Sequence, residues 1–155
     1  MFIPILIPIA FLFLACPDHS SSNHHTIDLS MPQSLTLSGD TGVLSGLSNL
    51  KIGHARFKIS NPNPDPVEVF IHKAELTQGD GRKELGQLHF MAEDDKESKT
   101  VESFIVPEKG GMAFLISFEP VSPRPGSHSV HLTLRANGEF LEGICPIVVE
   151  RRLPR

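Results

Sequence analysis

The chain contains neither tryptophan nor tyrosine, and it has only two cysteines among its 155 residues. Sugar-binding β-sandwiches usually stack pyranose faces on tryptophan or tyrosine rings, so this composition argues against a carbohydrate site. The phenylalanines that follow residue 15 are better explained as core residues. With a single cysteine, Cys145, in the body of the chain, the fold must be held by a hydrophobic core rather than by a network of disulfides.

Recognisable catalytic motifs are also missing. The sequence has no Gly-x-Ser-x-Gly elbow, no His-Glu-x-x-His zinc motif, no Cys-x-x-Cys pair and no phosphate-binding glycine loop. Eight histidines and many serines and aspartates leave a hydrolase open only as a chance arrangement of side chains. We therefore expect a protein that is not an enzyme and that uses no cofactor.

The charge balance argues against nucleic acid as a partner. The formal net charge is −4, and basic residues cluster only in the tail at residues 151–155. A nucleic-acid-binding domain would present a basic face to the phosphate backbone. We expect the tail to be a solvated chain terminus.

The N-terminal segment, Met1–Ala15, is almost wholly apolar and contains no charged residue. Since a helix needs about 20 apolar residues to span a bilayer, we interpret this segment as an export signal. Residues 16–26 then form a polar stretch that we expect to be a flexible tether. Its histidines, His19, His24 and His25, should be solvated, because a flexible linker offers a metal no rigid scaffold.

The end of the signal, Leu12-Phe13-Leu14-Ala15-Cys16, resembles the lipobox of bacterial lipoprotein precursors. The resemblance implies cleavage after Ala15 and lipid modification of Cys16, which would hold the protein at a membrane of the bacterial cell envelope. Whether that is the inner or the outer membrane stays open. In this case Cys145 would be a lone buried thiol; otherwise a Cys16–Cys145 disulfide is possible, in a secreted or periplasmic protein.

The C-terminal part of the chain shows strand periodicity. Apolar and polar residues alternate through Ser129–Arg135, and Asn137-Gly138 is typical of a type I′ turn. We therefore predict a hairpin between Val130–Ala136 and Glu139–Glu150. Because proline donates no ladder hydrogen bond, the last strand should be an edge strand at Pro146 or be broken there.

Turn-bounded apolar segments predict the remaining strands, near residues 27–37, 55–59, 67–74, 84–91, 104–106 and 113–118. Between them, 43–50 should be a connector, Asn61–Pro66 a stiff exposed loop with three prolines, and the acidic segment 92–100 a solvated loop rather than a calcium site. These assignments give seven to eight strands in one domain over residues 27–150. The fold class that we predict is all-β, an immunoglobulin-like antiparallel sandwich.

Several stretches of this domain resemble immunoglobulin-like domains of the MSP and ASPM/SPD-2/Hydin type. They are Ala55–Asn61, Asp65–Val69, Val106–Gly111, Ile116–Pro120 and His131–Leu134. Domains of this type serve adhesion, assembly and scaffolding, and the resemblance implies no enzymatic residue.

Two functional hypotheses follow. The first is a membrane-anchored module that binds a protein partner through an exposed sheet edge or through the proline-rich loop, with Asn61, Asn63 and Asp65 as contacts. The second is a carrier of a small ligand or metal that uses His54, His72 and His131. The three histidines could cooperate only if their strands are neighbours and share one face.

Overall fold

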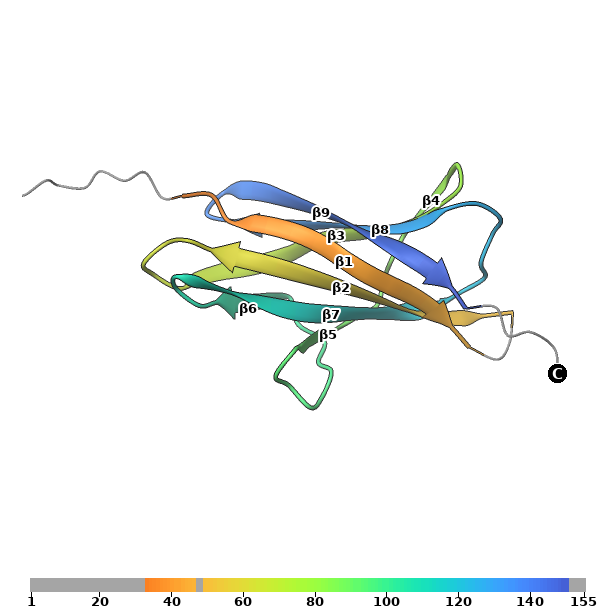
Figure 1. The fold of residues 1–155 in the computed structure, drawn as a ribbon, viewed down its shortest axis with the longest axis horizontal. Coiled ribbons are helices and arrows are strands. Elements are labelled where there is room, and N and C mark those ends of the chain that lie inside the picture. The colour runs from red at the N-terminus through yellow and green to blue at the C-terminus, as the bar shows by residue number, and fades with distance from the viewer. Residues whose placement is uncertain (1–32, 47–48, 151–155) are drawn as a thin grey trace, which may run out of the picture. The chain divides into compact units, whose positions relative to one another are not determined.

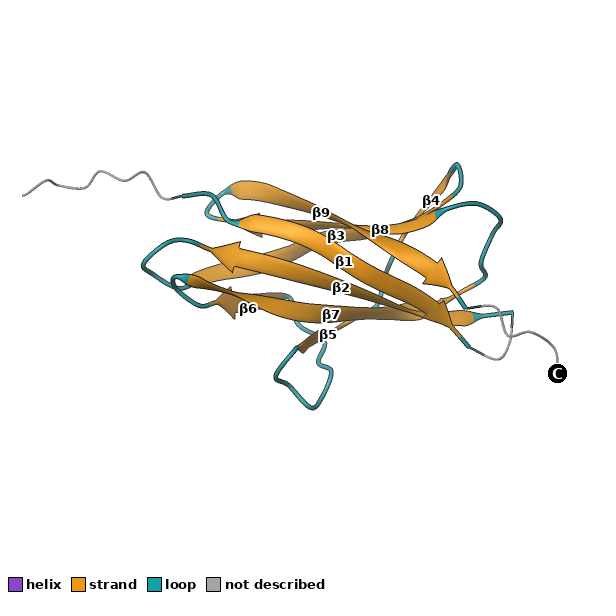
Figure 2. Ribbon diagram, in the orientation of Figure 1, coloured by secondary structure: helices purple, strands orange, loops and turns teal. Residues whose placement is uncertain are grey.

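The computed structural model describes residues 33–46 and 49–150, which are drawn in Figure 1 and coloured by secondary structure in Figure 2. In these ranges the regular structure is entirely β, and no helix is long and apolar enough to span a membrane. The strands are β1 (Thr36–Ser45), β2 (Lys51–Asn61), β3 (Val67–Gln78), β4 (Gly81–Glu84), β5 (Leu88–Ala92), β6 (Ser103–Val106), β7 (Gly110–Val121), β8 (His128–Ala136) and β9 (Glu139–Val149).

The strands follow the order β4-β3-β8-β9-β1-β2-β7-β5, and β6 pairs with the first half of β3. Neighbouring strands are antiparallel except β1 and β9, which run parallel from the Gly42–Ile147 pair to the Leu44–Val149 pair. This is the strand order of an immunoglobulin-like sandwich, with β3, β8 and β9 in one sheet and β1, β2, β7 and β5 in the other. The predicted fold class is confirmed, although the sheet is mixed and the described residues form nine strands rather than seven or eight.

The core is built from the inward-facing residue of each alternating pair. At its centre the ring of Phe114 lies 5.8 Å from that of Phe57 and 5.1 Å from those of Phe90 and Phe104. Phe57 and Phe114 are almost completely buried. Closely packed aromatic rings contribute beyond their buried area, so this cluster should be a main source of stability.

The prediction for the first strand was wrong in its position. Residues 36–45 form β1, so most of the expected strand at 27–37 lies outside the described residues and the expected connector at 43–50 begins inside β1. The misplacement has a physical cause: β1 carries glycines at Gly39 and Gly42, and a bulge between them interrupts its alternation. A Cβ atom at Gly39 would lie only 2.0 Å from the carbonyl oxygen of Ile144, so β1 needs glycine to approach β9.

The C-terminal hairpin is confirmed. β8 and β9 pair without a register shift, and Asn137 and Gly138 adopt φ angles of 51° and 79° in the turn. β9 is unbroken at Pro146, and at this point it pairs on one side only, with Ser129 of β8, so the first of the two predicted alternatives is confirmed. The ladder with β1 starts only at the next residue, Ile147, so Pro146 lies where that ladder has not yet begun.

The ambiguous segment 84–91 contains parts of two strands. Glu84 ends β4, and β5 begins at Leu88, so the preference for strand was correct for the second part. β4 reads Gly-Arg-Lys-Glu and has no apolar residue, which is why periodicity did not find it. The signal (1–15), the tether (16–26) with Cys16, and the tail (151–155) lie outside the described residues.

Candidate binding surfaces

The expectation that Asn61 and Asn63 lie on an exposed loop was wrong. The side chain of Asn61 is fully buried, and its Nδ2 donates to the main-chain oxygens of Asp65 (2.9 Å) and Pro107 (3.1 Å). Asn63 is buried too, and its Nδ2 donates to the main-chain oxygen of Gln33 at 2.8 Å. Buried amides satisfy main-chain groups that the prolines leave unpaired, so they hold the loop in place. Of the three predicted contacts, Asp65 alone is exposed.

The three histidines of the carrier hypothesis lie on three different strands. Nδ1 of His54 on β2 is 2.8 Å from the Ser117 hydroxyl, the ring of His72 on β3 lies 4.9 Å from that of Phe140 in a tilted arrangement, and His131 is on β8. Two strands, β9 and β1, separate β2 from β8 in the sheet order. Across the described part of the chain, no three His, Cys, Asp or Glu side chains are grouped so as to hold a metal ion. The histidine site that the hypothesis requires is therefore not formed.

The outer surface of β9 is unusually apolar. Phe140, Ile144 and Val148 point away from the core with 58%, 56% and 58% of their surface exposed, and Pro146 between them is also exposed. We call these four residues the β9 outer face. Antiparallel sheets with one solvated face normally place polar side chains there. From Gly143 to Val149 both faces of β9 are apolar, because Cys145 and Ile147 fill the inner one. On the outer one the exposed Glu142 lies between Phe140 and Ile144.

Residues on neighbouring strands extend the apolar character of this face. Val43 of β1 pairs with Val148, and exposed Phe70 of β3 lies under the guanidinium of Arg135, 5.5 Å from its ring centre. Arg135 is in turn directly opposite Phe140. The outer side of this sheet therefore combines apolar side chains with an arginine held between two aromatic residues.

The sequence carries a signal for this surface that the analysis of strand periodicity missed. β8 alternates strictly between inward apolar and outward polar residues, with His131 and Thr133 among the latter. The segment Gly143–Val149 has no polar residue at any outward position. An antiparallel strand segment that is apolar on both sides departs from the usual pattern of one apolar and one polar face.

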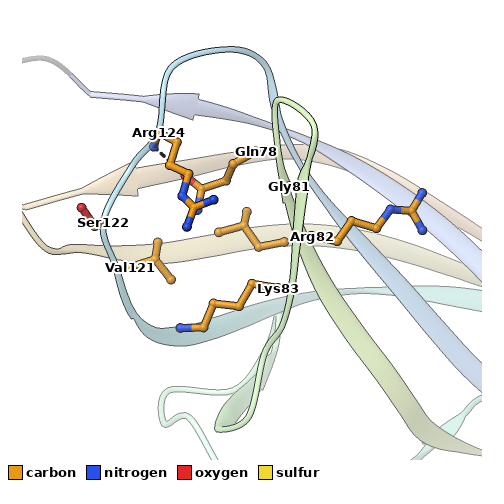
Figure 3. A pocket seen from close by; sticks show the side chains of 8 residues that line it. Gln78, Gly81, Arg82, Lys83, Val121, Ser122 and Arg124 are labelled. Carbon is orange, nitrogen blue, oxygen red and sulfur yellow. Dashed lines mark hydrogen bonds between the residues drawn. The ribbon is translucent and has the colours of Figure 1, made fainter.

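A basic pocket of about 500 Å³ lies at the end of the sandwich, between β4 and the loop of residues 122–127 (Figure 3). Leu76 and Val121 are among its lining residues and are almost completely buried. Lys83, Ser122 and Arg124 contribute polar atoms at its exposed rim. The sequence analysis did not identify this pocket, because its residues come from segments that are far apart in the chain.

Gln78 fixes one wall of this pocket. Its Oε1 accepts a hydrogen bond from the backbone N–H of Arg124 at 2.7 Å and lies 3.2 Å from Nε2 of His128. His128 is buried at the start of β8. The backbone N–H of Gly79 also donates to the oxygen of Ser127 at 2.9 Å. The loop is thus tied to the β3–β4 turn from two sides.

Cys145 is a free thiol with no exposed surface, and it faces the core from β9. Removal from water disfavours the thiolate and raises the pKa of Cys145. This environment is that of an inert structural cysteine rather than of a nucleophile.

Comparisons with known proteins give structural similarity at low sequence identity. No protein-family model matches the sequence, and no curated protein matches it. The ASH/PapD-like domain 7 of human CEP192 is similar over 78% of this chain and 87% of its own, with 9% identity and a TM-score of 0.41. A FixG-related protein from Vibrio parahaemolyticus is similar over 77% of this chain and 98% of its own, with 11% identity and a TM-score of 0.43. The N-terminal domain of PorA is similar over 74% and 97%, with 12% identity and a TM-score of 0.37.

Proposed function

We propose that this chain is a non-catalytic lipoprotein of the bacterial cell envelope whose β-sandwich binds a protein partner through the β9 outer face. The observation that supports binding is the row of apolar side chains, Phe140, Ile144, Pro146 and Val148, exposed along an interior strand. Contiguous apolar surface of this kind marks interaction sites on folded domains.

The β9 outer face has the composition of an interface centre. Phe140 and its neighbour Phe70 are aromatic anchors, and Arg135 between them adds a cation whose charge can face a partner. Burying side chains that are about half exposed contributes about 1 kcal/mol each, so the row supplies part of the binding free energy and polar contacts at its rim must supply the rest. His131 and Thr133 of β8 supply polar groups next to the row.

The proposed lipid anchor rests on the sequence around Cys16 and is tested separately. We expect the Cys16→Ser variant to leave the membrane fraction when it is expressed in a bacterial host, because it has no acyl chains. Intact-mass spectrometry of the membrane-extracted wild-type protein should show a mature chain that begins at an acylated Cys16. A chain that begins elsewhere, or an unmodified Cys16, would contradict the lipoprotein assignment.

The partner surface is tested by placing a photoreactive phenylalanine analogue at Ile144 in the membrane-anchored protein. We expect a discrete adduct with one envelope protein after irradiation of cells. The same analogue at Lys58, exposed on β2 in the other sheet, is the matched control and should give no such adduct.

A second substitution ties the adduct to the apolar row. With the analogue at Phe140, the change Val148→Asp should abolish the adduct, because a charge in the row opposes burial. Adducts with lipid or with a second copy of the chain alone would contradict binding of a different protein, and equal labelling from Lys58 would contradict the assigned face.

A further inference from the structure

We propose that the pocket between β4 and the 122–127 loop binds a small organic anion, with a carboxylate or phosphate on Arg124. This site is separate from the β9 outer face and does not depend on it. A carrier of a small ligand was expected to use histidines, whereas this pocket offers cations instead.

The charge of the pocket favours an anionic ligand. Its lining includes Arg124, Lys83 and Arg82, whose guanidinium points away from the other two cations, but no carboxylate. Lys83 is partly neutralised by Glu119 at 3.5 Å, whereas Arg124 pairs with no carboxylate within the described residues. A planar guanidinium binds carboxylates and phosphates with two parallel hydrogen bonds, and the Ser122 hydroxyl at the rim can donate another.

The volume of the pocket is suitable for a small molecule. A cavity of about 500 Å³ is in the usual range of small-molecule sites. Leu76 and Val121 also line the pocket but are nearly completely buried, so a ligand would contact mainly the basic and polar side chains. Lys83 and Arg124 favour an anion and would repel a bare metal cation.

The pocket is also preorganised. Gln78 holds the main chain of Arg124, so the arginine does not need to be ordered from a free loop when the ligand binds. Gly81 leaves room for the guanidinium, since a Cβ atom there would lie 3.3 Å from Nη1 of Arg124. Figure 3 shows Arg124 and Lys83 on one side of the β4 segment, while the Arg82 side chain points away to the other side.

This difference supplies a matched control. We would follow the backbone amide signals of Gly81, Ser122 and Arg124 by NMR during titration of the full-length protein with sodium butyrate or inorganic phosphate at constant ionic strength. We expect saturable shifts at these amides with at least one anion. Butyrate binding more tightly than phosphate would assign the site to carboxylates with an apolar tail, and the reverse order to phosphate groups.

Two arginine variants distinguish binding at a specific site from general attraction of anions to positive charge. Arg124→Gln should weaken binding about tenfold, and Arg82→Gln less than about twofold, although both remove one exposed charge. The backbone hydrogen bond to Gln78 is kept in Arg124→Gln, so its amide spectrum should otherwise be unchanged. No saturable shift up to about 50 mM of either anion, an equal loss in both variants, or equal binding of neutral 1-butanol would overturn the proposal.

Discussion

Asn61 accepts two hydrogen bonds from Asn63 on the same side-chain oxygen, one from the backbone N–H and one from Nδ2, each 3.0 Å long. Through its own Nδ2, Asn61 donates to the main-chain oxygen of Asp65 in the proline-rich loop and to that of Pro107 just after β6. The side-chain hydrogen bonds of the two asparagines therefore take the place of the backbone hydrogen bonds that the prolines cannot form. They connect the β2–β3 loop to the end of β6.

Replacing Asn61 should therefore destabilise the domain much more than replacing a residue of an exposed loop would. We expect Asn61→Ala to lower the free energy of unfolding by about 2–4 kcal/mol, because it leaves several buried main-chain groups unpaired. Denaturant unfolding measures this change. Asp65→Ala is the control, since only the main-chain oxygen of Asp65 is used, and a similar loss in both variants would contradict the assigned role of the amide.

The contact between β1 and β9 is tested at Gly39. Any Cβ there meets the main chain of Ile144, which cannot rotate away as a side chain could. We expect Gly39→Ala to destabilise the domain by about 1–3 kcal/mol or more. Gly86→Ala, where the added Cβ comes only within 3.9 Å of Glu119 Oε1, should change stability by less than about 0.5 kcal/mol. If the two variants unfold at the same denaturant concentration, β1 does not approach β9 this closely.

Substituting one buried and one exposed phenylalanine distinguishes core residues from residues of the β9 outer face. Phe114→Ala should lose about 3–5 kcal/mol of stability, because it opens a cavity in the aromatic cluster. Phe140→Ala should lose less than about 1 kcal/mol in the isolated protein, since Phe140 is largely exposed. Thermal or denaturant unfolding of both variants checks the contrast, and a costly Phe140→Ala would mean that the β9 outer face is part of the core.

The buried thiol should make stability depend on pH in the alkaline range. Because burial raises the pKa of Cys145, the folded protein holds the thiol proton more tightly than the unfolded chain does. This contribution is complete below the ordinary thiol pKa of 9.0 and is lost as the pH rises through the raised value. We expect the loss of stability between pH 8 and pH 10.5 to be smaller in Cys145→Ala than in the wild type.

Thiol labelling gives an independent check of the same environment. In the Cys16→Ser background, Cys145 should react with a thiol reagent only as fast as the protein opens, and immediately in denaturant. Rapid labelling of the folded protein would contradict the buried position.

The parts of the fold that follow from local sequence were predictable. Strict alternation in Ser129–Arg135 and the Asn137-Gly138 turn specify a hairpin without reference to the rest of the chain. β1 was not predictable in this way. Gly39 is required by the close approach of Ile144, a residue far away in the sequence.

The candidate surfaces were harder to predict than the strands, since each depends on tertiary neighbours. Asn61 and Asn63 have the composition of an exposed loop, and only the carbonyl groups brought by β6 explain why they are buried. Arg124 and Lys83 meet because the β4 hairpin and the 122–127 loop lie at the same end of the sandwich. For the β9 outer face a local signal existed, namely the lack of polar residues at the outward positions of Gly143–Val149.

The parallel seam between β1 and β9 also bears on when the protein can fold. The first and last strands of the described domain close the sandwich against each other, so the two sheets cannot be joined until the C-terminal strand is available. Pairings between distant segments are slow to form, because the loop must close before its contacts stabilise it. A nascent chain that lacks β9 should therefore be unable to close the sandwich. That delay would be compatible with the export that we propose, since an exported chain crosses the membrane before it folds.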